Sequence, residues 1–305
     1  MDAIRAEHLT RRFGETLAVD DVTFNVQPGE IFGLVGPDGA GKTTIMRLLT
    51  GILDPSAGEA FVDGLDIRKH AEAVKDRIGY MSQRFGLYPD LTVIENIDFY
   101  ADLYGVTRKE REPRTQELLA FSNLTPFALR KAGNLSGGMK QKLGLACALI
   151  HTPRVLFLDE PTNGVDPVSR RDFWRILYRL LEERVTIFVS TAYMDEAERC
   201  GRIGLMHRGR LLACDSVPGV KRLMPGSLLE LRCDAPRAAA ALLRKEHDDV
   251  ALFGDRIHIR VDDAEKATRS LQEAMGKAGF EIHELRGVEP TLEDIFMAVL
   301  PKETP

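Results

Sequence analysis

Two glycine-rich segments of the sequence carry residue types that bind phosphate groups. The first, Gly36-Pro37-Asp38-Gly39-Ala40-Gly41-Lys42-Thr43, matches the pattern G-x-x-x-x-G-K-[ST] at every fixed position. The apolar run Ile31–Val35 precedes it and the helix-forming run Thr43–Leu49 follows it, which is the context that the pattern requires. Its glycines let consecutive backbone N–H groups surround an anion at a positive helix end. We therefore expect Lys42 to reach the β- and γ-phosphates of a nucleotide and the Thr43 hydroxyl to ligate Mg²⁺.

The second segment, Leu135-Ser136-Gly137-Gly138-Met139-Lys140-Gln141, opens a predicted helix over Met139–Ile150. The N–H groups at the start of that helix form a second anion-binding end. Alone, a Ser-Gly pair at such a place is more typical of an ordinary helix N-cap than of a functional site. One nucleotide cannot contact both segments of a single chain.

Two carboxylates follow a buried strand. The run Val155–Leu158 contains no polar residue, which is typical of a strand buried on both faces of a parallel sheet. Asp159 and Glu160 come next, followed by Pro161. Because ligands collect beyond the carboxyl ends of strands in open α/β sheets, we expect Asp159 beside the phosphate loop. Their place at the end of a buried strand argues against surface or helix-capping roles.

In this order the three segments resemble those of the ATP-binding cassette (ABC) ATPases, and the resemblance covers residues 1 to about 220. Gln83, in Tyr80-Met81-Ser82-Gln83, matches the family's loop that contacts Mg²⁺ and faces a membrane subunit. The stretch Asn163-Gly164-Val165-Asp166 matches the loop that crosses between paired cassettes. Phe13 falls where the family stacks an aromatic ring on adenine, and an ordinary core phenylalanine is the alternative.

The resemblance implies ATP hydrolysis by two cassettes that dimerise head to tail, each closing its signature segment over the other's nucleotide. Water attacks the γ-phosphorus in line, and catalysis comes mostly from positioning and from stabilising phosphate charge. Glu160 is expected to be the general base. The residues expected to bind ATP are Phe13, Gly36, Pro37, Asp38 (where the family often has asparagine), Gly39, Ala40, Gly41, Lys42, Thr43, Thr44 and Gln83. The signature residues acting on the partner's nucleotide are Leu135, Ser136, Gly137, Gly138 and Gln141, and Mg²⁺ is assigned to Thr43, Gln83 and, through water, Asp159.

One position departs from the family pattern. The family has histidine in a phrase such as Ser-Thr-His-x-x-Asp-Glu-Ala, whereas this chain reads Ser190-Thr191-Ala192-Tyr193-Met194-Asp195-Glu196-Ala197. In the family, that histidine contacts the γ-phosphate and holds the attacking water in register with the glutamate, and alanine can do neither. We therefore expect slow hydrolysis by the chain alone, as the impaired half of an asymmetric cassette pair. A homodimer that tolerates the loss is the alternative.

Composition narrows the possible functions. The chain has 305 residues and a net charge of −5, which argues against a nucleic-acid groove lined with basic side chains. No run approaches the ~18 apolar residues of a membrane span, and the first residues lack a signal-peptide profile. The cysteines show no metal-ligand spacing. Four histidines, which lack any catalytic context, are expected on the surface or in loops: His8, His70, His151 and His207. Together these observations predict a cytoplasmic protein.

The pattern along residues 1–220 predicts an α/β P-loop NTPase cassette with a RecA-like core. Residues 1–30 alternate apolar and polar, and 58–67 contain an Asp63-Gly64 turn, so an antiparallel β subdomain is expected. Residues from about 84 to 140 read as a helical subdomain, whose first helix starts with the capping box Thr92-x-x-Glu95. The charged run Arg108–Arg114 is interpreted as an exposed connection before a helix over Thr115–Ser122.

Residues 221–305 predict a separate small α+β domain with β-α-β-α-β order. Its last helix opens with Glu289-Pro290-Thr291-Leu292-Glu293-Asp294-Ile295-Phe296, which resembles the C-terminal ending of cassettes that serve ABC-2-type exporters, including drug-resistance exporters. The domain shows no phosphate, metal or nucleophile signature. A structural or dimer-stabilising appendage is the first interpretation, and a ligand sensor is the alternative.

The leading functional hypothesis is the ATP-hydrolysing subunit that powers an ABC-2-type membrane exporter, peripheral on the inner face of the cell membrane. Its expected partners are membrane permease subunits and a second ABC cassette, identical or different. The stretch Gly79–Tyr88 looks most like the N-terminal cassette of bacterial exporter ATPases that fuse two cassettes. A non-transport cassette acting on ribosomes or DNA is the alternative. A P-loop kinase or G-protein-like switch is disfavoured by the signature segment.

Overall fold

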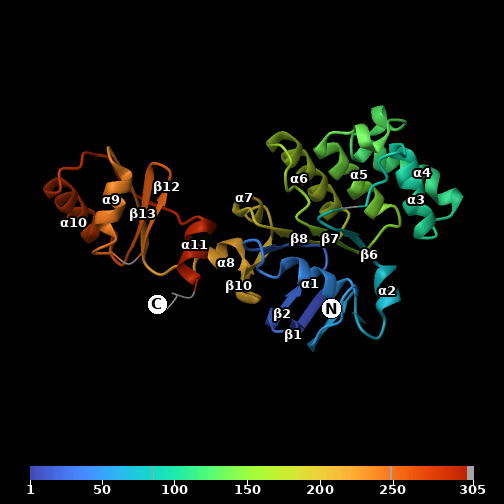
Figure 1. The fold of residues 1–305 in the computed structure, drawn as a ribbon, viewed down its shortest axis with the longest axis horizontal. Coiled ribbons are helices and arrows are strands. Elements are labelled where there is room, and N and C mark those ends of the chain that lie inside the picture. Colours follow the sequence, from blue (N-terminus) through green and yellow to red (C-terminus); the bar gives the residue numbers. More distant parts are fainter. Residues whose placement is uncertain (85, 248, 301–305) are drawn as a thin grey trace. The chain divides into compact units, whose positions relative to one another are not determined.

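The chain divides into two compact units, Met1–Asp215 and Ser216–Pro305, in a computed structural model that describes residues 1–84, 86–247 and 249–300 (Figure 1). The sequence pattern predicts the boundary at 220/221. In the structure it lies at 215/216, and the short helix α8 (Val217–Lys221) belongs to the second unit. Phe85, inside the stretch compared with tandem cassettes, and the last residues of the second domain, 301–305, lie outside the described residues.

An antiparallel sheet forms the start of the first unit, as predicted. Its strands in spatial order are β2 (Thr16–Val26), β1 (Ile4–Phe13), β4 (Ala57–Val62) and β5 (Leu65–Asp66). The turn between β4 and β5 is the predicted Asp63-Gly64 pair, and both residues have positive φ angles, 48° and 77°. A two-residue hairpin turn of this kind requires positive φ at both central positions, which explains the residue types.

The second sheet of this unit carries the phosphate loop. Its strands in spatial order are β10 (Arg210–Ser216), β9 (Arg202–His207), β3 (Ile31–Val35), β8 (Thr186–Thr191), β7 (Val155–Asp159) and β6 (Ile78–Met81). Strands β9, β3, β8, β7 and β6 pair in parallel. Every residue of β3, β7 and β8 is buried, which accounts for the apolar runs 31–35, 155–158 and 187–189 within them. The register pairs Val35 with Thr191 and Asp159 with Ser190, so the carboxyl ends of three strands meet at one edge.

The helices of the first unit include one that the sequence reading misplaced. They are α1 (Lys42–Leu49), α2 (Ala71–Lys75), α3 (Val93–Leu103), α4 (Arg108–Phe121), α5 (Gly137–Leu149), α6 (Pro167–Glu182) and α7 (Met194–Ala197), with short 3₁₀ turns at Thr125–Phe127 and Ala132–Asn134. The interpretation of Arg108–Arg114 as a connection is wrong, because these residues form the first half of α4. Their charge reflects the solvated face of a helix. Arg111, for example, pairs with Asp102 of α3 and buries most of its side chain.

The second unit has the predicted α+β arrangement with one additional strand. Its antiparallel sheet has the order β12 (Val250–Phe253), β13 (Arg256–Val261), β11 (Ser227–Cys233) and β14 (Ile282–Val288). Its other helices are α9 (Pro236–Leu243), α10 (Ala264–Lys277) and α11 (Leu292–Val299). Apolar residues on one face, such as Leu231 and Ile259, share a core with residues of α9 and α10. Strand β12, which is short and only partly buried, was not predicted from the sequence.

Candidate functional site

The phosphate loop lies between β3 and α1 and leaves no room for a side chain at two of its glycines, Gly36 and Gly41. A Cβ atom on Gly36 would come within 2.3 Å of the Met206 carbonyl oxygen, and one on Gly41 within 2.5 Å of the Ala18 carbonyl oxygen. Gly41 also has a φ angle of 103°, which residues with side chains rarely adopt. The loop borders an open cleft of about 430 Å³. The described residues lining it are Thr16, Leu17, Ala18, Asp38, Gly39, Ala40, Gly41, Lys42, Thr43, Thr44, Gln83, Glu160, Arg208 and Gly209.

The Lys42 ammonium is held inside the loop. Its side chain is only 4% exposed, and Nζ donates to the carbonyl oxygens of Gly36 (2.7 Å) and Pro37 (3.1 Å). Nζ also lies 3.1 Å from Glu160 Oε1, whose side chain is 9% exposed. A buried cation at this place is poised for an anion in the loop, and an incoming phosphate has to replace some of these contacts.

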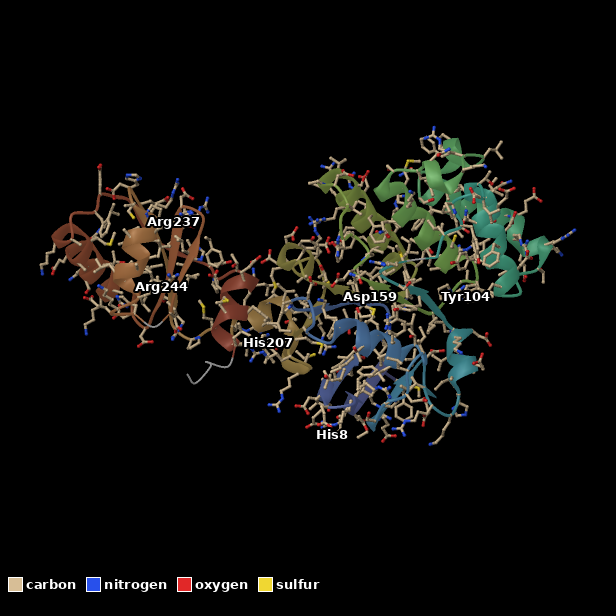
Figure 2. All side chains as sticks on the ribbon, in the orientation of Figure 1. His8, Tyr104, Asp159, His207, Arg237 and Arg244 are labelled. Carbon is tan, nitrogen blue, oxygen red and sulfur yellow. The ribbon has the colours of Figure 1, made fainter. Side chains whose placement is uncertain are left out.

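Asp159 offers one free oxygen next to Thr43. Its Oδ1 accepts hydrogen bonds from the hydroxyl groups of Ser190 (2.7 Å) and Thr43 (3.1 Å). Its Oδ2 is buried and has no hydrogen-bond partner among the described residues. Burial raises the pKa of Asp159, against the opposing effect of the Ser190 and Thr43 hydroxyl groups. A buried carboxylate oxygen without a donor beside a threonine hydroxyl fits a divalent cation with oxygen ligands (Asp159 is labelled in Figure 2).

Glu160 adopts an unusual backbone conformation that directs its carboxylate into the cleft. Its φ angle is 47°, in the left-handed region that residues with side chains seldom occupy. Its N–H donates to the Ser190 hydroxyl (3.0 Å), and its Oε2 accepts from Gln83 Nε2 (3.0 Å) and Asn163 Nδ2 (3.2 Å). The structure therefore brings together residues that the sequence placed in one site: Lys42, Thr43, Gln83, Asp159 and Glu160.

The signature segment is separate from this cleft. Ser136 is the N-cap of α5, where its hydroxyl accepts from the Met139 N–H (3.3 Å), and both Ser136 and Gly137 are exposed. A Cβ on Gly138 would meet Ser169 Cβ at 2.5 Å, so this glycine allows α5 to pack against α6. A Cβ on Gly137 would meet nothing within 4 Å inside the chain. Of the five predicted signature residues, Leu135 is buried and Gln141 half-buried, and none of the five lines the phosphate-loop cleft.

Phe13 is not a core residue, so the core alternative is wrong. It is 43% exposed, and the Arg11 guanidinium lies 4.5 Å from its ring centroid. Phe13 does not line the described cleft, whereas Thr16, three residues further on, does. Thus the ring is accessible to a ligand, although it is not part of the lining of the phosphate-loop cleft.

Ala192 lies at the edge of the phosphate loop. It is exposed and follows Thr191, whose carbonyl oxygen accepts a hydrogen bond from the Gly36 N–H (3.3 Å). Among the histidines, His151 lies in a loop as expected but is half-buried. Its ring stacks on Tyr104 with centroids 3.7 Å apart, its Nε2 lies 2.8 Å from the Ile78 carbonyl oxygen, and burial lowers its pKa (Tyr104 is labelled in Figure 2).

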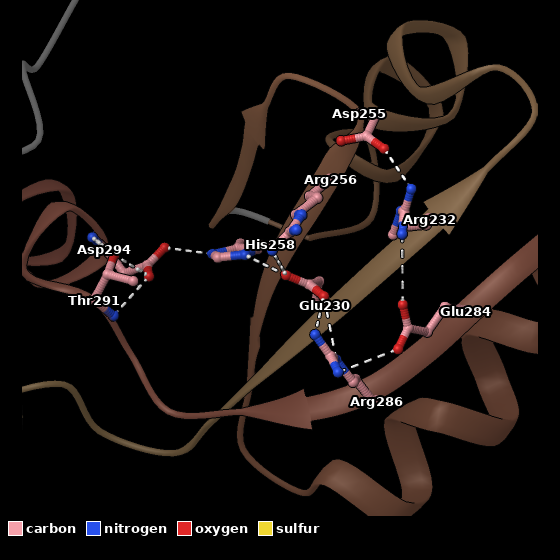
Figure 3. A network of polar contacts seen from close by, with 9 residues as sticks. All are labelled: Glu230, Arg232, Asp255, Arg256, His258, Glu284, Arg286, Thr291 and Asp294. Carbon is pink, nitrogen blue, oxygen red and sulfur yellow. Dashed lines mark hydrogen bonds and ion pairs between the residues drawn. The ribbon is translucent and has the colours of Figure 1, made fainter.

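A second polar cluster, in the C-terminal unit, was missed by the sequence reading (Figure 3). His258 Nδ1 lies 2.8 Å from Asp294 Oδ1, and its Nε2 lies 3.4 Å from Glu230 Oε2. Glu230 is 4% exposed at its side chain and also accepts from Arg286 (2.9 Å) and Arg256 (3.2 Å). The hydrogen bond to Asp294 raises the pKa of His258. Asp294 also closes the capping box that starts α11, so the cluster attaches the terminal helix to the sheet.

Within the ranges that the structure describes, no group of three or more His, Cys, Asp or Glu side chains could hold a metal ion by itself. A cation at Asp159 would therefore need ligands beyond these side-chain types, such as the Thr43 hydroxyl or phosphate oxygens.

Family models match both units. The model described as ABC transporter covers residues 19–163, and the model described as ATP-binding protein DrrA1-3-like, C-terminal domain, covers residues 216–300. The Nod factor export ATP-binding protein I of Burkholderia thailandensis is 37% identical over 97% of this chain and 96% of its own length. The daunorubicin resistance ATP-binding protein DrrA2 of Streptomyces coeruleorubidus is 33% identical over 99% of this chain and 96% of its length.

Another relative is longer than this chain. The Escherichia coli protein described as "Probable multidrug ABC transporter ATP-binding protein YbhF" is 43% identical over 72% of this chain, but the match spans only 38% of its own length.

Solved structures share the architecture of the first unit. The structure of an ATP-binding subunit of an ABC transporter aligns with a TM-score of 0.66 and 28% identity, over 72% of this chain and 92% of that one. A dimeric, post-hydrolysis ATP-binding cassette bound to ADP and Pi aligns with a TM-score of 0.64 and 26% identity, over 70% and 98%. The predicted α/β cassette fold is thereby confirmed. The phosphate loop, the acidic pair and the relatives matched over nearly the whole chain lead to one conclusion: the chain belongs to the ATP-binding proteins of ABC transporters, a family of ATPases.

Proposed function

We propose that this chain is the ATP-hydrolysing subunit of an ABC-2-type exporter and the weaker half of a cassette pair. The observation that carries the proposal is the buried cluster of Lys42, Asp159 and Glu160 at the strand ends beside the phosphate loop. The relatives matched along their full length support export, since they are named for Nod factor export and for daunorubicin resistance.

The loop and Lys42 bind the phosphates of ATP. The N–H groups around Gly39 and Gly41 and the Lys42 ammonium supply positive charge where the β- and γ-phosphates lie. Thr43, Gln83 and, through water, Asp159 would hold Mg²⁺, which would neutralise phosphate charge. The buried Oδ2 of Asp159, which lacks a donor, supports this assignment.

Glu160 acts as the general base for the attacking water. In the present arrangement its carboxylate is engaged by Lys42, Gln83 and Asn163. When phosphate takes over Lys42, one carboxylate oxygen of Glu160 becomes available to accept a proton from water. Its left-handed backbone keeps the side chain directed at the cleft during this exchange.

A second cassette completes the site. Ser136 and Gly137 are exposed and lie outside the chain's own cleft, so they are available to a nucleotide held by another chain. A related cassette has been solved as a dimer with ADP and Pi, which supports pairing. At this chain's own phosphate loop, Ala192 offers only a methyl group where the family has histidine, so hydrolysis there is slow.

The helical subdomain offers a surface for a membrane permease. Tyr88, Phe99 and Leu103 are 43%, 37% and 65% exposed, and the rings of Tyr88 and Phe99 contact each other with centroids 4.5 Å apart. Throughout the described residues, no helix combines the length and apolar character needed to cross a bilayer. Docking on permease subunits would place the chain on the inner face of the cell membrane.

Hydrolysis by the purified chain and by reconstituted pairs tests the proposal. We expect the chain alone to bind Mg-ATP but to hydrolyse it slowly, and Ala192→His to raise the rate. Adding a histidine-containing cassette should raise the rate further, and Ser136→Arg in this chain should cancel that gain by blocking the partner's site. If the isolated chain turns over ATP as fast as histidine-containing cassettes, the asymmetric pair is wrong and a homodimer remains.

A non-transport cassette acting on ribosomes or DNA remains the alternative proposal. The exporter names of full-length relatives and the net charge of −5 both disfavour it.

A further inference from the structure

A buried carboxylate that the site above does not use lies close behind it. Glu196, in α7, is 0% exposed. The Thr162 hydroxyl donates to its Oε1 (2.5 Å), and the Thr191 hydroxyl donates to its Oε2 (2.8 Å). Both threonines are 1% exposed. One carboxylate therefore joins the segment after β7 to the last residue of β8.

Arg170 of α6 completes the cluster. Its Nε lies 3.3 Å from Glu196 Oε1, and its guanidinium lies 4.5 Å from the centroid of the Tyr193 ring. Burying a carboxylate is unfavourable unless it is paired and hydrogen-bonded. Since both oxygens of Glu196 have partners, these contacts favour a single arrangement of the segments that supply them.

The two segments that Glu196 joins lead to Glu160 and to Ala192. Thr162 is two residues after Glu160, and hydrogen bonds from Asn163 N to Glu160 O (3.1 Å) and from Val165 N to Thr162 O (3.1 Å) close the turn between them. A left-handed backbone such as that of Glu160 persists only where its surroundings determine it. Anchoring Thr162 supplies part of that constraint.

The other anchored segment leads to Ala192. Thr191 directly precedes it, and the Thr191 hydroxyl accepts a hydrogen bond from the Tyr193 N–H (3.0 Å) while donating to Glu196. The backbone turn at Ala192 is thus fixed from both sides. Tyr193 is 38% exposed, and its ring is held by Arg170.

We propose that Glu196 is a positioning residue for ATP hydrolysis, which fixes the turn after Glu160 relative to the turn at Ala192 without touching the nucleotide. The proposal rests on hydrolysis at Glu160 and does not depend on how cassettes pair. Because Ala192 provides no side chain to orient the attacking water, the placement of Glu160 by Glu196 carries a larger share of the positioning in this chain.

Single-turnover hydrolysis by the full chain, in excess over radiolabelled Mg-ATP, tests this role and detects slow reactions. We expect Glu196→Gln and Thr162→Val to slow hydrolysis about 10- to 100-fold, since small misplacements of reacting groups cost this much. ATP affinity should change less than about twofold. Thr162→Ser, which keeps the hydroxyl, should restore the rate.

The matched control is Asp195→Asn, in the exposed neighbour of Glu196, whose carboxylate lies 3.8 Å from Arg170 Nη1. Its rate should equal that of the wild type. Wild-type rates in both Glu196→Gln and Thr162→Val would overturn the proposal, as would parallel losses of rate and ATP affinity, which indicate a purely structural role. If Glu196→Gln does not fold, Thr162→Val and Thr191→Val decide by the same criteria. A wild-type chain that binds ATP but never hydrolyses it would refute the proposed ATPase function itself, and this role with it.

Discussion

The buried pair of Lys42 and Glu160 predicts a stability effect that does not require nucleotide. Replacing Lys42 with methionine keeps most of the side-chain volume but removes the cation 3.1 Å from Glu160 Oε1. Breaking a buried ion pair by removing one partner costs about 3–5 kcal/mol. Here Gln83 and Asn163 still donate to Glu160 Oε2, and each such hydrogen bond is worth about 1 kcal/mol. We therefore expect Lys42→Met to destabilise the first unit by about 2 kcal/mol.

Thermal unfolding without nucleotide measures this loss. For a unit of this size, 1 kcal/mol corresponds to about 2–4 °C in Tm, so a decrease of about 4–8 °C is expected. The double variant Lys42→Met/Glu160→Gln removes the stranded charge and should recover most of it. Glu160→Gln alone should cost less than Lys42→Met, because the Lys42 ammonium keeps its contacts with two loop carbonyl groups.

Comparing Tm with and without Mg-ATP distinguishes the role of Lys42 in the ion pair from its role in phosphate binding. Saturating Mg-ATP at about 100 times Kd should stabilise the wild type by about 2.7 kcal/mol and Lys42→Met hardly at all, since the phosphate contacts are lost. An unchanged Tm of Lys42→Met without nucleotide, or strictly additive losses in the double variant, would refute the ion-pair reasoning. Undiminished stabilisation of Lys42→Met by ATP would refute the assignment of the phosphate loop.

Three further predictions follow from particular contacts. Gly138→Ala should lower the free energy of unfolding, measured by chemical denaturation, by about 1–3 kcal/mol, because the new Cβ would meet Ser169. Gly137→Ala should leave this free energy unchanged but should slow hydrolysis by the cassette pair in an ATPase assay. A chain ending at Asp215 should fold and gain Tm on adding Mg-ATP, and an insoluble or unresponsive product would show that the second unit is required. Because the pKa of His258 is raised, its interactions stabilise the C-terminal unit fully below about pH 6.5, and this contribution is lost as the pH rises through the folded pKa. The Tm of the wild type should therefore fall with rising pH, and that of His258→Gln should fall less.

The sequence predicted those parts of the site whose residues are determined by local backbone requirements. Gly36 and Gly41 have no space for a side chain, and the acidic pair lies at the end of a strand whose burial shows in its composition. The turn at Asp63-Gly64 and the capping box at Thr92 were predictable for the same reason, since a few neighbouring residues determine each.

Contacts between distant segments could not be predicted in this way. Glu196 reads as an ordinary residue of an acidic helix start, and only the packing of β7, β8 and α6 shows that both its oxygens are bound. His258 likewise lies in an alternating strand, and its partners Glu230 and Asp294 come from elements far away in the sequence. The charged first half of α4 misled the reading because a solvated helix face and an exposed connection have the same composition.

The carboxylate and the backbone of Glu160 are held by different residues, so the contacts that nucleotide binding changes are distinct from those that position the main chain. Its carboxylate contacts Lys42, Gln83 and Asn163, all of which lie within the site and can exchange partners when phosphate arrives. Its backbone is fixed by Ser190 and by the turn that runs to Thr162, which Glu196 anchors from behind. Because no nucleotide atom has to displace those backbone contacts, the side chain can be released without loss of the main-chain geometry. Under the proposed mechanism, a site that lacks the histidine contact depends most on this division, since Glu160 alone would then orient the attacking water.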